Sequence, residues 1–209
     1  IGTFTANITM PNVAAVLEIG RLVRTIDIDL GETGHATTFL GYATISTTDK
    51  KFGAGSLALD GTDGIITLPD HANWDMLSQT NFTIHLWVNL TTHGGNSPCV
   101  AQDEDGGNNG WVFENLHGTG LRFLAWTAGV KIVELVGAEI SDSSWHHVAV
   151  AKVGTEYGIY KDGAQIAYVN DASTDIYAAV LQIGASAGLG TFTNGYIDEL
   201  QITHDNLFT

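Results

Sequence analysis

A polar, glycine-rich segment that ends in a tryptophan carries the groups that a ligand site needs. Residues 102–110 read Gln-Asp-Glu-Asp-Gly-Gly-Asn-Asn-Gly, and Trp111 follows. Sugar sites combine an aromatic face that packs on the ring with fixed polar groups that hold the hydroxyls. The alternative is a solvated turn with Trp111 tucked into the core, because glycine and asparagine are first of all turn formers. The predicted ligand residues in this segment are Asp103, Asp105, Asn108, Asn109 and Trp111.

A strand-like stretch at 82–88 predicts a second set of ligand residues. Its apolar side chains alternate with a group that includes His85 and Trp87, so the two groups face opposite ways. If the second face lines a concave sheet, His85 could meet Trp126 and Arg122, and we predict that these three bind ligand. The alternative places Trp87 in the core and leaves His85 partly buried with its hydrogen bonds satisfied.

Two adjacent histidines lie in the strand-like stretch 145–150. His146 and His147 cannot chelate one ion together, because successive side chains of a strand point to opposite faces. We interpret both as scaffold residues rather than metal ligands.

The composition excludes several partners. The 209-residue chain has 23 Asp and Glu against 8 Lys and Arg, which gives a net charge of −15. Nucleic acids and anionic membrane surfaces both attract basic footprints, so neither is an expected partner. No apolar run reaches the ~20 residues that span a bilayer, which argues against membrane insertion. The chain starts at Ile1 without a methionine, and we expect a fragment of a longer protein.

Short strands with glycine-rich turns must position these residues. Asp162-Gly163 lies between two strand-like runs and is typical of a tight hairpin turn, whose central positions need φ > 0. Many such strands and scarce helix predict an all-β, two-sheet antiparallel β-sandwich. We expect residues 21–209 to form this domain, with a strand at 22–30 that joins a sheet. Residues 1–20 are expected to form a peripheral segment, and one interpretation is that they are the end of a preceding module packed on the edge of the domain.

Six short motifs occur in order along the last three quarters of the chain. They are residues 52–57 (FGAGSL), 59–61 (LDG), 82–88 (FTIHLWV), 145–150 (WHHVAV), 159–163 (IYKDG) and 195–200 (GYIDEL). Together they resemble the laminin-G-like domains of the concanavalin A-like jelly-roll family. The resemblance implies two antiparallel sheets stacked face to face, one of them concave. It also implies sugar binding, adhesion or protein–protein contact as the usual role.

The same resemblance implies a structural calcium ion as cofactor. Related jelly rolls often hold a Ca²⁺ that clamps the chain ends to a loop through carboxylate, carbonyl and water oxygens. Asp198 matches the family position, and Gly61 would offer a carbonyl. Asp27 or Asp29, near the start of the fold, could add carboxylates. The alternative is that Asp198 simply hydrogen-bonds a neighbouring loop.

Glycosidases on this fold imply a third, less favoured function. Laminarinase-type enzymes carry two Glu flanking an Asp on one strand of the concave sheet, where alternation places all three on one face. The segment 27–32 begins with Asp, contains a glycine and lies too early in the chain. Asp198 and Glu199 face opposite ways. We therefore expect no enzymatic activity and no catalytic residues.

The residues together predict a binding module of a larger protein. We expect it to bind a glycan or a cell-surface polysaccharide, without catalysis. The parent protein is expected to be extracellular or to lie on the surface of a cell or a virion, for example in a phage tail. The alternative is a structural or protein-interaction domain without a small ligand, and the sequence leaves oligomer formation open.

Overall fold

The structure is a computed structural model that describes residues 28–29, 34–104 and 107–204. Within these ranges almost all regular structure is β-strand, and the helical part consists of two short 3₁₀ turns at Ala72–Trp74 and Met76–Ser78. No helix in this described part is long and apolar enough to cross a bilayer. The all-β prediction is confirmed.

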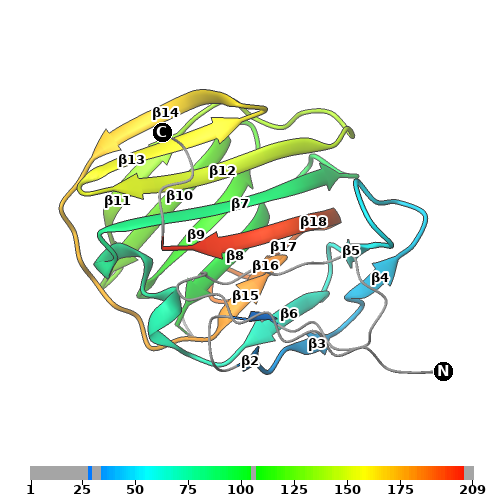
Figure 1. Cartoon of the computed structure of the whole chain (residues 1–209), viewed down its shortest axis with the longest axis horizontal. Helices are drawn as coiled ribbons and strands as arrows, with labels where there is room; N and C mark the ends of the chain where they lie inside the picture. The colour runs from blue at the N-terminus through cyan, green and yellow to red at the C-terminus, as the bar shows by residue number, and fades with distance from the viewer. Residues whose placement is uncertain (1–27, 30–33, 105–106, 205–209) are drawn as a thin grey trace, which may run out of the picture.

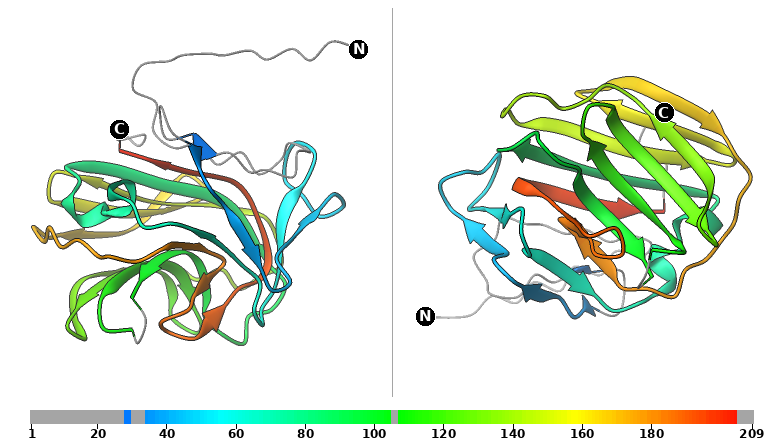
Figure 2. Two further views of the ribbon diagram at one scale, coloured as in Figure 1. Left: turned by 90° about the horizontal axis from the view of Figure 1, so that it is seen from below. Right: turned by 180° about the vertical axis from the view of Figure 1, so that it is seen from behind.

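Two seven-stranded antiparallel sheets stack face to face, as Figures 1 and 2 show. The sheet that we call sheet A has the order β14 (Ala164–Asn170), β13 (Glu156–Lys161), β12 (His146–Val153), β7 (Asn81–Leu90), β18 (Asn194–Thr203), β5 (Ser56–Asp60) and β4 (Thr44–Ser46). Sheet B has the order β11 (Val130–Val136), β10 (Gly120–Thr127), β9 (Gly110–Leu116), β8 (Ser97–Asp103), β15 (Leu181–Ile183), β6 (Ile65–Leu68) and β3 (Thr38–Leu40). The predicted two-sheet sandwich is therefore confirmed.

Four further strands form two small ribbons. β1 (Ile28–Asp29) pairs with β2 (Gly34–His35), and β16 (Ala185–Ser186) pairs with β17 (Thr191–Phe192). The described part of the predicted strand at 22–30 thus pairs only within its own ribbon and joins neither large sheet. The predicted peripheral segment 1–20 lies outside the described residues.

The core lies between the sheets and follows from strand alternation. In β7 the side chains of Phe82, Ile84, Leu86 and Val88 are fully buried, as the period-two pattern predicts. Full burial of such a side chain stabilises the fold by about 1.5–3 kcal/mol. The ring of Phe82 lies 6.0 Å from that of Phe123 in sheet B, so the two sheets are joined through aromatic contacts.

The predicted hairpin at Asp162-Gly163 joins β13 to β14. Asp162 has φ +51° and Gly163 φ +82°, the left-handed backbone that a type I′ turn requires at both central positions. One oxygen of the Asp162 carboxylate also accepts the backbone N–H of His147 at 3.0 Å. The turn residue therefore ties the hairpin to the start of β12.

A bulge interrupts β18 where it lies beside β7. Asp198 is opposite Trp87 and Gln201 is opposite His85, so two residues of β18 face the single residue between them on β7. Glu199 takes up the extra length with φ +51°. The bulge allows Asp198 and Gln201, three positions apart, to lie on the same outer face of sheet A.

Candidate functional site

The outer face of sheet B carries an apolar cluster that is separate from the main core. Strand alternation sends Trp111 of β9 and Phe123 of β10 into the sandwich, and their neighbours in sequence point the other way. Four of these outward side chains pack together and are at most 7% exposed: Ala101, Val112, Leu124 and Trp126.

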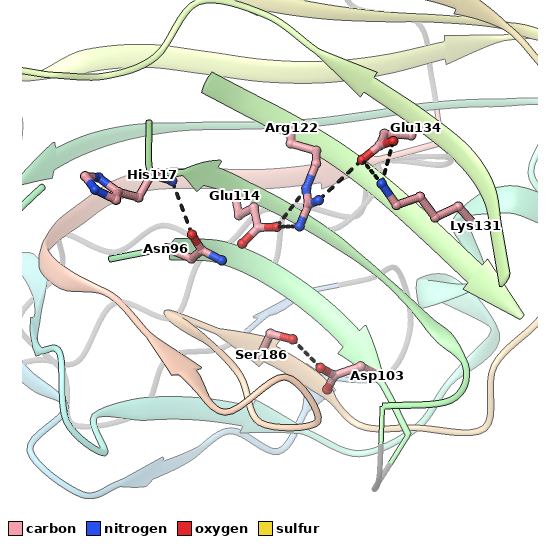
Figure 3. A network of polar contacts seen from close by, with 8 residues as sticks. All are labelled: Asn96, Asp103, Glu114, His117, Arg122, Lys131, Glu134 and Ser186. Carbon is pink, nitrogen blue, oxygen red and sulfur yellow. Dashed lines mark hydrogen bonds and ion pairs between the residues drawn. The ribbon is translucent and has the colours of Figure 1, made fainter. Parts of the chain in front are cut away.

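A row of charged side chains crosses the same face beside this cluster (Figure 3). Arg122 of β10 is directly opposite Glu114 of β9. Its Nε donates to Glu114 Oε1 at 3.0 Å, its Nη2 donates to the same oxygen, and its Nη1 donates to Glu134 Oε1 on β11 at 3.3 Å. Lys131 Nζ donates to both carboxylate oxygens of Glu134 at 2.8 Å. We call Glu114, Arg122, Glu134 and Lys131 the charged row.

Exposure rises steadily along the charged row. The side chain of Glu114 is 0% exposed, Arg122 11%, Glu134 31% and Lys131 58%. Glu114 Oε2 is buried and has no hydrogen-bond partner among the described residues. A buried carboxylate is tolerated when a cation compensates it, and Arg122 supplies that cation. The buried end of the row therefore fixes Arg122, and the exposed end can reach a ligand.

Glu134 is held in its ionised form. Burial raises its pKa, but the hydrogen bonds and charges of Lys131 and Arg122 together outweigh burial and lower the pKa below its ordinary value. The exposed part of the row therefore presents one fixed carboxylate acceptor beside two cationic donors.

Asp103 lies at the end of β8 and holds the ribbon β16–β17 in place. Its carboxylate accepts hydrogen bonds from the Gln182 amide and the Ser186 hydroxyl, and the residue is 4% exposed. A Cβ on Gly188 would lie 2.9 Å from the Glu104 carbonyl oxygen, so only glycine fits where this ribbon meets the chain after β8. These contacts give Asp103 a structural role and leave little of it for a ligand.

The prediction that Trp111 offers its face to a sugar is wrong. Trp111 is fully buried between the sheets, and its ring lies 6.0 Å from Phe123 in a stacked arrangement. Its indole N–H donates to the Trp74 carbonyl and to Gln102 Oε1, both at 3.0 Å. Burial of a large apolar ring with its one donor satisfied outweighs any gain from leaving it in water.

Trp126 remains on the outer face of sheet B but is 5% exposed, because the loop after β8 covers it. Its indole N–H donates to the Gly107 carbonyl at 2.8 Å. Asn109 fixes the same loop, since its Oδ1 accepts the Ala128 N–H at 2.8 Å and its Nδ2 donates to Glu104 at 2.6 Å. The prediction that Trp126 offers an open face to a sugar is therefore wrong, and the polar groups of Asn109 hold the loop in place instead of a ligand. Of the other predicted residues, Asn108 is exposed and Asp105 lies outside the described residues.

His85 does not meet Arg122 or Trp126. His85 and Trp87 point outward from sheet A, whereas Arg122 and Trp126 point outward from sheet B, so the whole sandwich separates the two pairs. Trp87 is half-buried on this outer face, 4.2 Å from Lys51 Nζ. The predicted single site made of all three ligand residues is therefore wrong. Only Arg122 and Trp126 share a face, because they lie four positions apart on β10.

Asp198 serves as a hydrogen-bonding clamp, the alternative that its position left open. Its Oδ2 accepts the backbone N–H groups of Lys51 and Phe52 at 2.8 and 2.9 Å, and Oδ1 accepts that of Glu199 at 3.0 Å. Burial raises the pKa of Asp198, and the three N–H groups and Lys50 oppose that rise. The carboxylate is fully buried, and both of its oxygens accept hydrogen bonds from the backbone.

The predicted calcium ligands do not converge where they are described. Gly61 follows Asp60, which pairs with Asn194, so it lies more than four residues along β18 from Asp198. At about 3.3 Å per residue this separation is too long for one ion. Asp27 and the side chain of Asp29 lie outside the described structure, and no group of three His, Cys, Asp or Glu that could hold a metal occurs among the described residues. Calcium binding itself stays a prediction.

Sequence reasoning missed three members of the charged row: Glu114, Glu134 and Lys131. A usable signal was present, because Glu114 and Arg122 are equally distant from Gly118 and a hairpin around that glycine pairs them. In the second hairpin, with its turn at Ala128-Gly129, Arg122 is opposite Val136 and Glu134 is opposite Leu124, so Glu134 lies diagonal to Arg122. Matching distances from a predicted turn therefore indicate the Glu114–Arg122 pair but not the diagonal contact of Arg122 with Glu134.

Comparison with known families and structures gives one family match. A model described as the concanavalin A-like lectin/glucanases superfamily matches residues 60–208. No curated protein matches the chain in sequence.

Several solved structures share the fold. Domain 4 of an extracellular GH43 arabinanase from Geobacillus stearothermophilus, in complex with arabinotriose, is 20% identical with a TM-score of 0.60, and the match covers 80% of this chain and 81% of that one. The CBM40 domain of a Ruminococcus gnavus sialidase, bound to α2,3-sialyllactose, is 18% identical with a TM-score of 0.54 and covers 63% and 80%.

The binding domain of botulinum neurotoxin DC, in complex with rat synaptotagmin II, is 11% identical with a TM-score of 0.68. The match covers 92% of this chain, which spans 48% of that binding-domain chain. At these identities the likenesses establish the fold, and all three neighbours are binding domains or domains solved with a sugar bound.

Proposed function

The chain belongs to the concanavalin A-like lectin/glucanases superfamily, and from that membership we propose that it is a non-catalytic carbohydrate-binding module. The proposed glycan lies on the outer face of sheet B, against the exposed end of the charged row. Solved neighbours that carry arabinotriose or sialyllactose support this class of ligand. The competing function is a structural or protein-interaction domain without a small ligand.

The charged row is the observation that carries the proposal. Arg122 has five N–H donors, and its bonds to Glu114 and Glu134 use three, so two donors remain. Glu134 offers acceptor lone pairs beside them, and Lys131 offers a further donor. Vicinal sugar hydroxyls both donate and accept, so a fixed carboxylate next to a fixed guanidinium can bind two of them at once.

The same row argues against glycoside hydrolysis. A hydrolase of the usual type needs one carboxylic acid that keeps its proton near neutral pH. Glu134 is stabilised as a carboxylate by Lys131 and Arg122, which lower its pKa, and Glu114 is bound to Arg122 away from solvent. Neither group is arranged to deliver a proton to a leaving group, so the proposed module holds glycans without cleaving them.

The module is proposed to belong to a larger protein that works outside the cell or on a cell or virion surface. One solved neighbour is a domain of an extracellular enzyme, and another is the binding domain of a toxin. Glycans and surface polysaccharides are the partners available in such places.

A glycan array on the full chain, followed by calorimetry on the glycans that bind, tests the proposal. We expect Glu134→Gln to weaken binding by about tenfold or more, since a hydrogen bond to a charged group contributes about 1.5–3 kcal/mol. Lys51→Ala, which removes a lysine from the outer face of sheet A, is the matched control and should leave affinity unchanged.

Two results would overturn the proposal. One is a glycan that Glu134→Gln and wild type bind equally, because the ligand would then lie elsewhere on the molecule. The other is a complete lack of glycan binding by a folded chain that forms a stable multimer in light scattering, which would favour the structural alternative.

A further inference from the structure

Two histidines meet on the outer face of sheet A, on the opposite side of the molecule from the charged row. His85 lies on β7 and His147 on the neighbouring β12, which run side by side in Figure 1. His85 Nδ1 and His147 Nε2 are 3.2 Å apart, and the ring centroids are 5.3 Å apart. Each ring therefore directs a nitrogen at the other.

Gln201 fixes which nitrogen of His85 carries the proton. His85 Nε2 lies 2.9 Å from Gln201 Oε1 on β18. An amide oxygen only accepts, so Nε2 carries the hydrogen and the lone pair of Nδ1 points toward His147. Histidines that ligate metals commonly donate their other ring N–H to a carbonyl or carboxylate in this way.

We propose that His85 Nδ1 and His147 Nε2 together bind a divalent transition-metal ion such as Zn²⁺. With Zn–N bonds of about 2.0–2.1 Å, two nitrogens of a tetrahedral site stand about 3.3 Å apart, close to the separation of the facing pair. On metal binding, His147 releases the Nε2 hydrogen that it shares with His85 and carries its proton on Nδ1. Two protein ligands leave the other positions to water or to an oxygen of another molecule.

The surroundings keep both rings neutral, as metal ligation requires. Burial lowers the pKa of His85, while its bond to Gln201 opposes that shift. Burial and the neighbouring His85 lower the pKa of His147, and Asp162 near the β13–β14 turn opposes it. The ring of Trp87 lies 5.4 Å from that of His147 and closes one side of the pair with an apolar surface.

The other histidine clusters of the described chain lack this arrangement. His146 has both ring nitrogens engaged by carboxylates, Nδ1 with Asp162 at 2.7 Å and Nε2 with Asp142 at 3.1 Å. His35 and His71 have centroids 4.5 Å apart, but His71 Nδ1 accepts the backbone N–H of Asn73. The His35–His71 pair is thus a matched control with two rings in contact and one nitrogen already committed.

The test is calorimetric titration of the metal-free full chain with ZnCl₂, together with melting curves with and without Zn²⁺. An ion that binds the native state raises the melting temperature. We expect His147→Gln and His85→Gln each to abolish the shift, and His35→Gln to leave it intact. Gln201→Ala keeps both ligands and should weaken Zn²⁺ binding by about 10–100-fold, the usual effect of losing such a partner.

Imidazole ¹⁵N chemical shifts locate the ion if a variant fails to fold. In wild type, the signals of His85 and His147 should move on adding Zn²⁺ while those of His35 and His71 stay. Absence of Zn²⁺ binding by wild type would mean that the contact is only a hydrogen bond between neutral rings. Binding that persists in His85→Gln and His147→Gln would also overturn the proposal, because the ion would then be elsewhere.

Discussion

Strand alternation builds the outer faces of both sheets, but the polar side chains on the two faces are satisfied in different ways. On sheet B, Arg122 stands between Glu114 and Glu134, and opposite charges satisfy one another. On sheet A, His85 and His147 are uncharged, and a lone pair of one ring faces the other ring. Charge pairing fixes the Arg122 side chain on sheet B, whereas on sheet A the lone pair of His85 Nδ1 can accept a proton and is a proposed metal ligand.

The largest expected effect breaks the charge pairing on sheet B. Arg122→Met leaves the fully buried Glu114 carboxylate without its cation, which should lower the free energy of unfolding by about 3–5 kcal/mol. Urea denaturation at neutral pH measures the change. Adding Glu114→Gln to Arg122→Met should recover most of the loss, since no buried charge then remains. A loss below about 1 kcal/mol in the single variant would contradict the pairing.

A smaller effect is expected on sheet A, where Asp198 clamps the backbone. Asp198→Ala removes the acceptor of the Lys51, Phe52 and Glu199 N–H groups, and unmade hydrogen bonds of buried groups cost about 1–3 kcal/mol. Because Phe52 is 47% exposed, water replaces part of what is lost and the total should fall within that range. Chemical denaturation measures it, and Glu156→Ala, at an exposed carboxylate at the start of β13, is the control.

The smallest expected effect is a pH dependence of the melting temperature that differs between the two faces, because their titrating groups have different pKa values. The folded pKa values of His85 and His147 lie below 6.5, so their contribution to stability is present above pH 6.5 and is lost as pH falls through the folded values. The pKa of Glu134 is lowered from 4.5, so its contribution is lost only at more acidic pH. Melting temperatures in chelator between about pH 8 and about pH 5 should therefore decline less in His85→Gln than in wild type. An equal decline of melting temperature with pH in His85→Gln and wild type would contradict the lowered pKa of His85.

The fold was predictable because its signals are local. Alternation in 82–88 and the Asp162-Gly163 turn specify strands and a hairpin without knowledge of distant partners. The site was only partly predictable because its charged residues come from three neighbouring strands, β9, β10 and β11. Arg122 was found as a lone cation, but its exposed partner Glu134 comes from another strand. Trp111 misled because a tryptophan after a polar loop fits a ligand site as well as a core, and only packing against Phe123 decides.

The histidines show the same limit more sharply. Alternation correctly separates His146 from His147, which excludes a site made of those two residues. It cannot show that His147 faces His85, which is 62 residues away in sequence, because that contact depends on which strands are neighbours. The order of strands in such a sandwich depends on the whole chain, so local sequence patterns cannot show that β7 and β12 are neighbours.

The bulge in β18 changes the parity of the strand. Before Glu199, even-numbered residues such as Asp198 face outward; after it, odd-numbered residues such as Gln201 do. If the same residues paired with β7 without the bulge, Gln201 would point into the core and Leu200 and Ile202 would face outward. The bulge at Glu199 therefore absorbs an extra residue that would otherwise invert the second half of the strand, and it keeps the partner of His85 within reach.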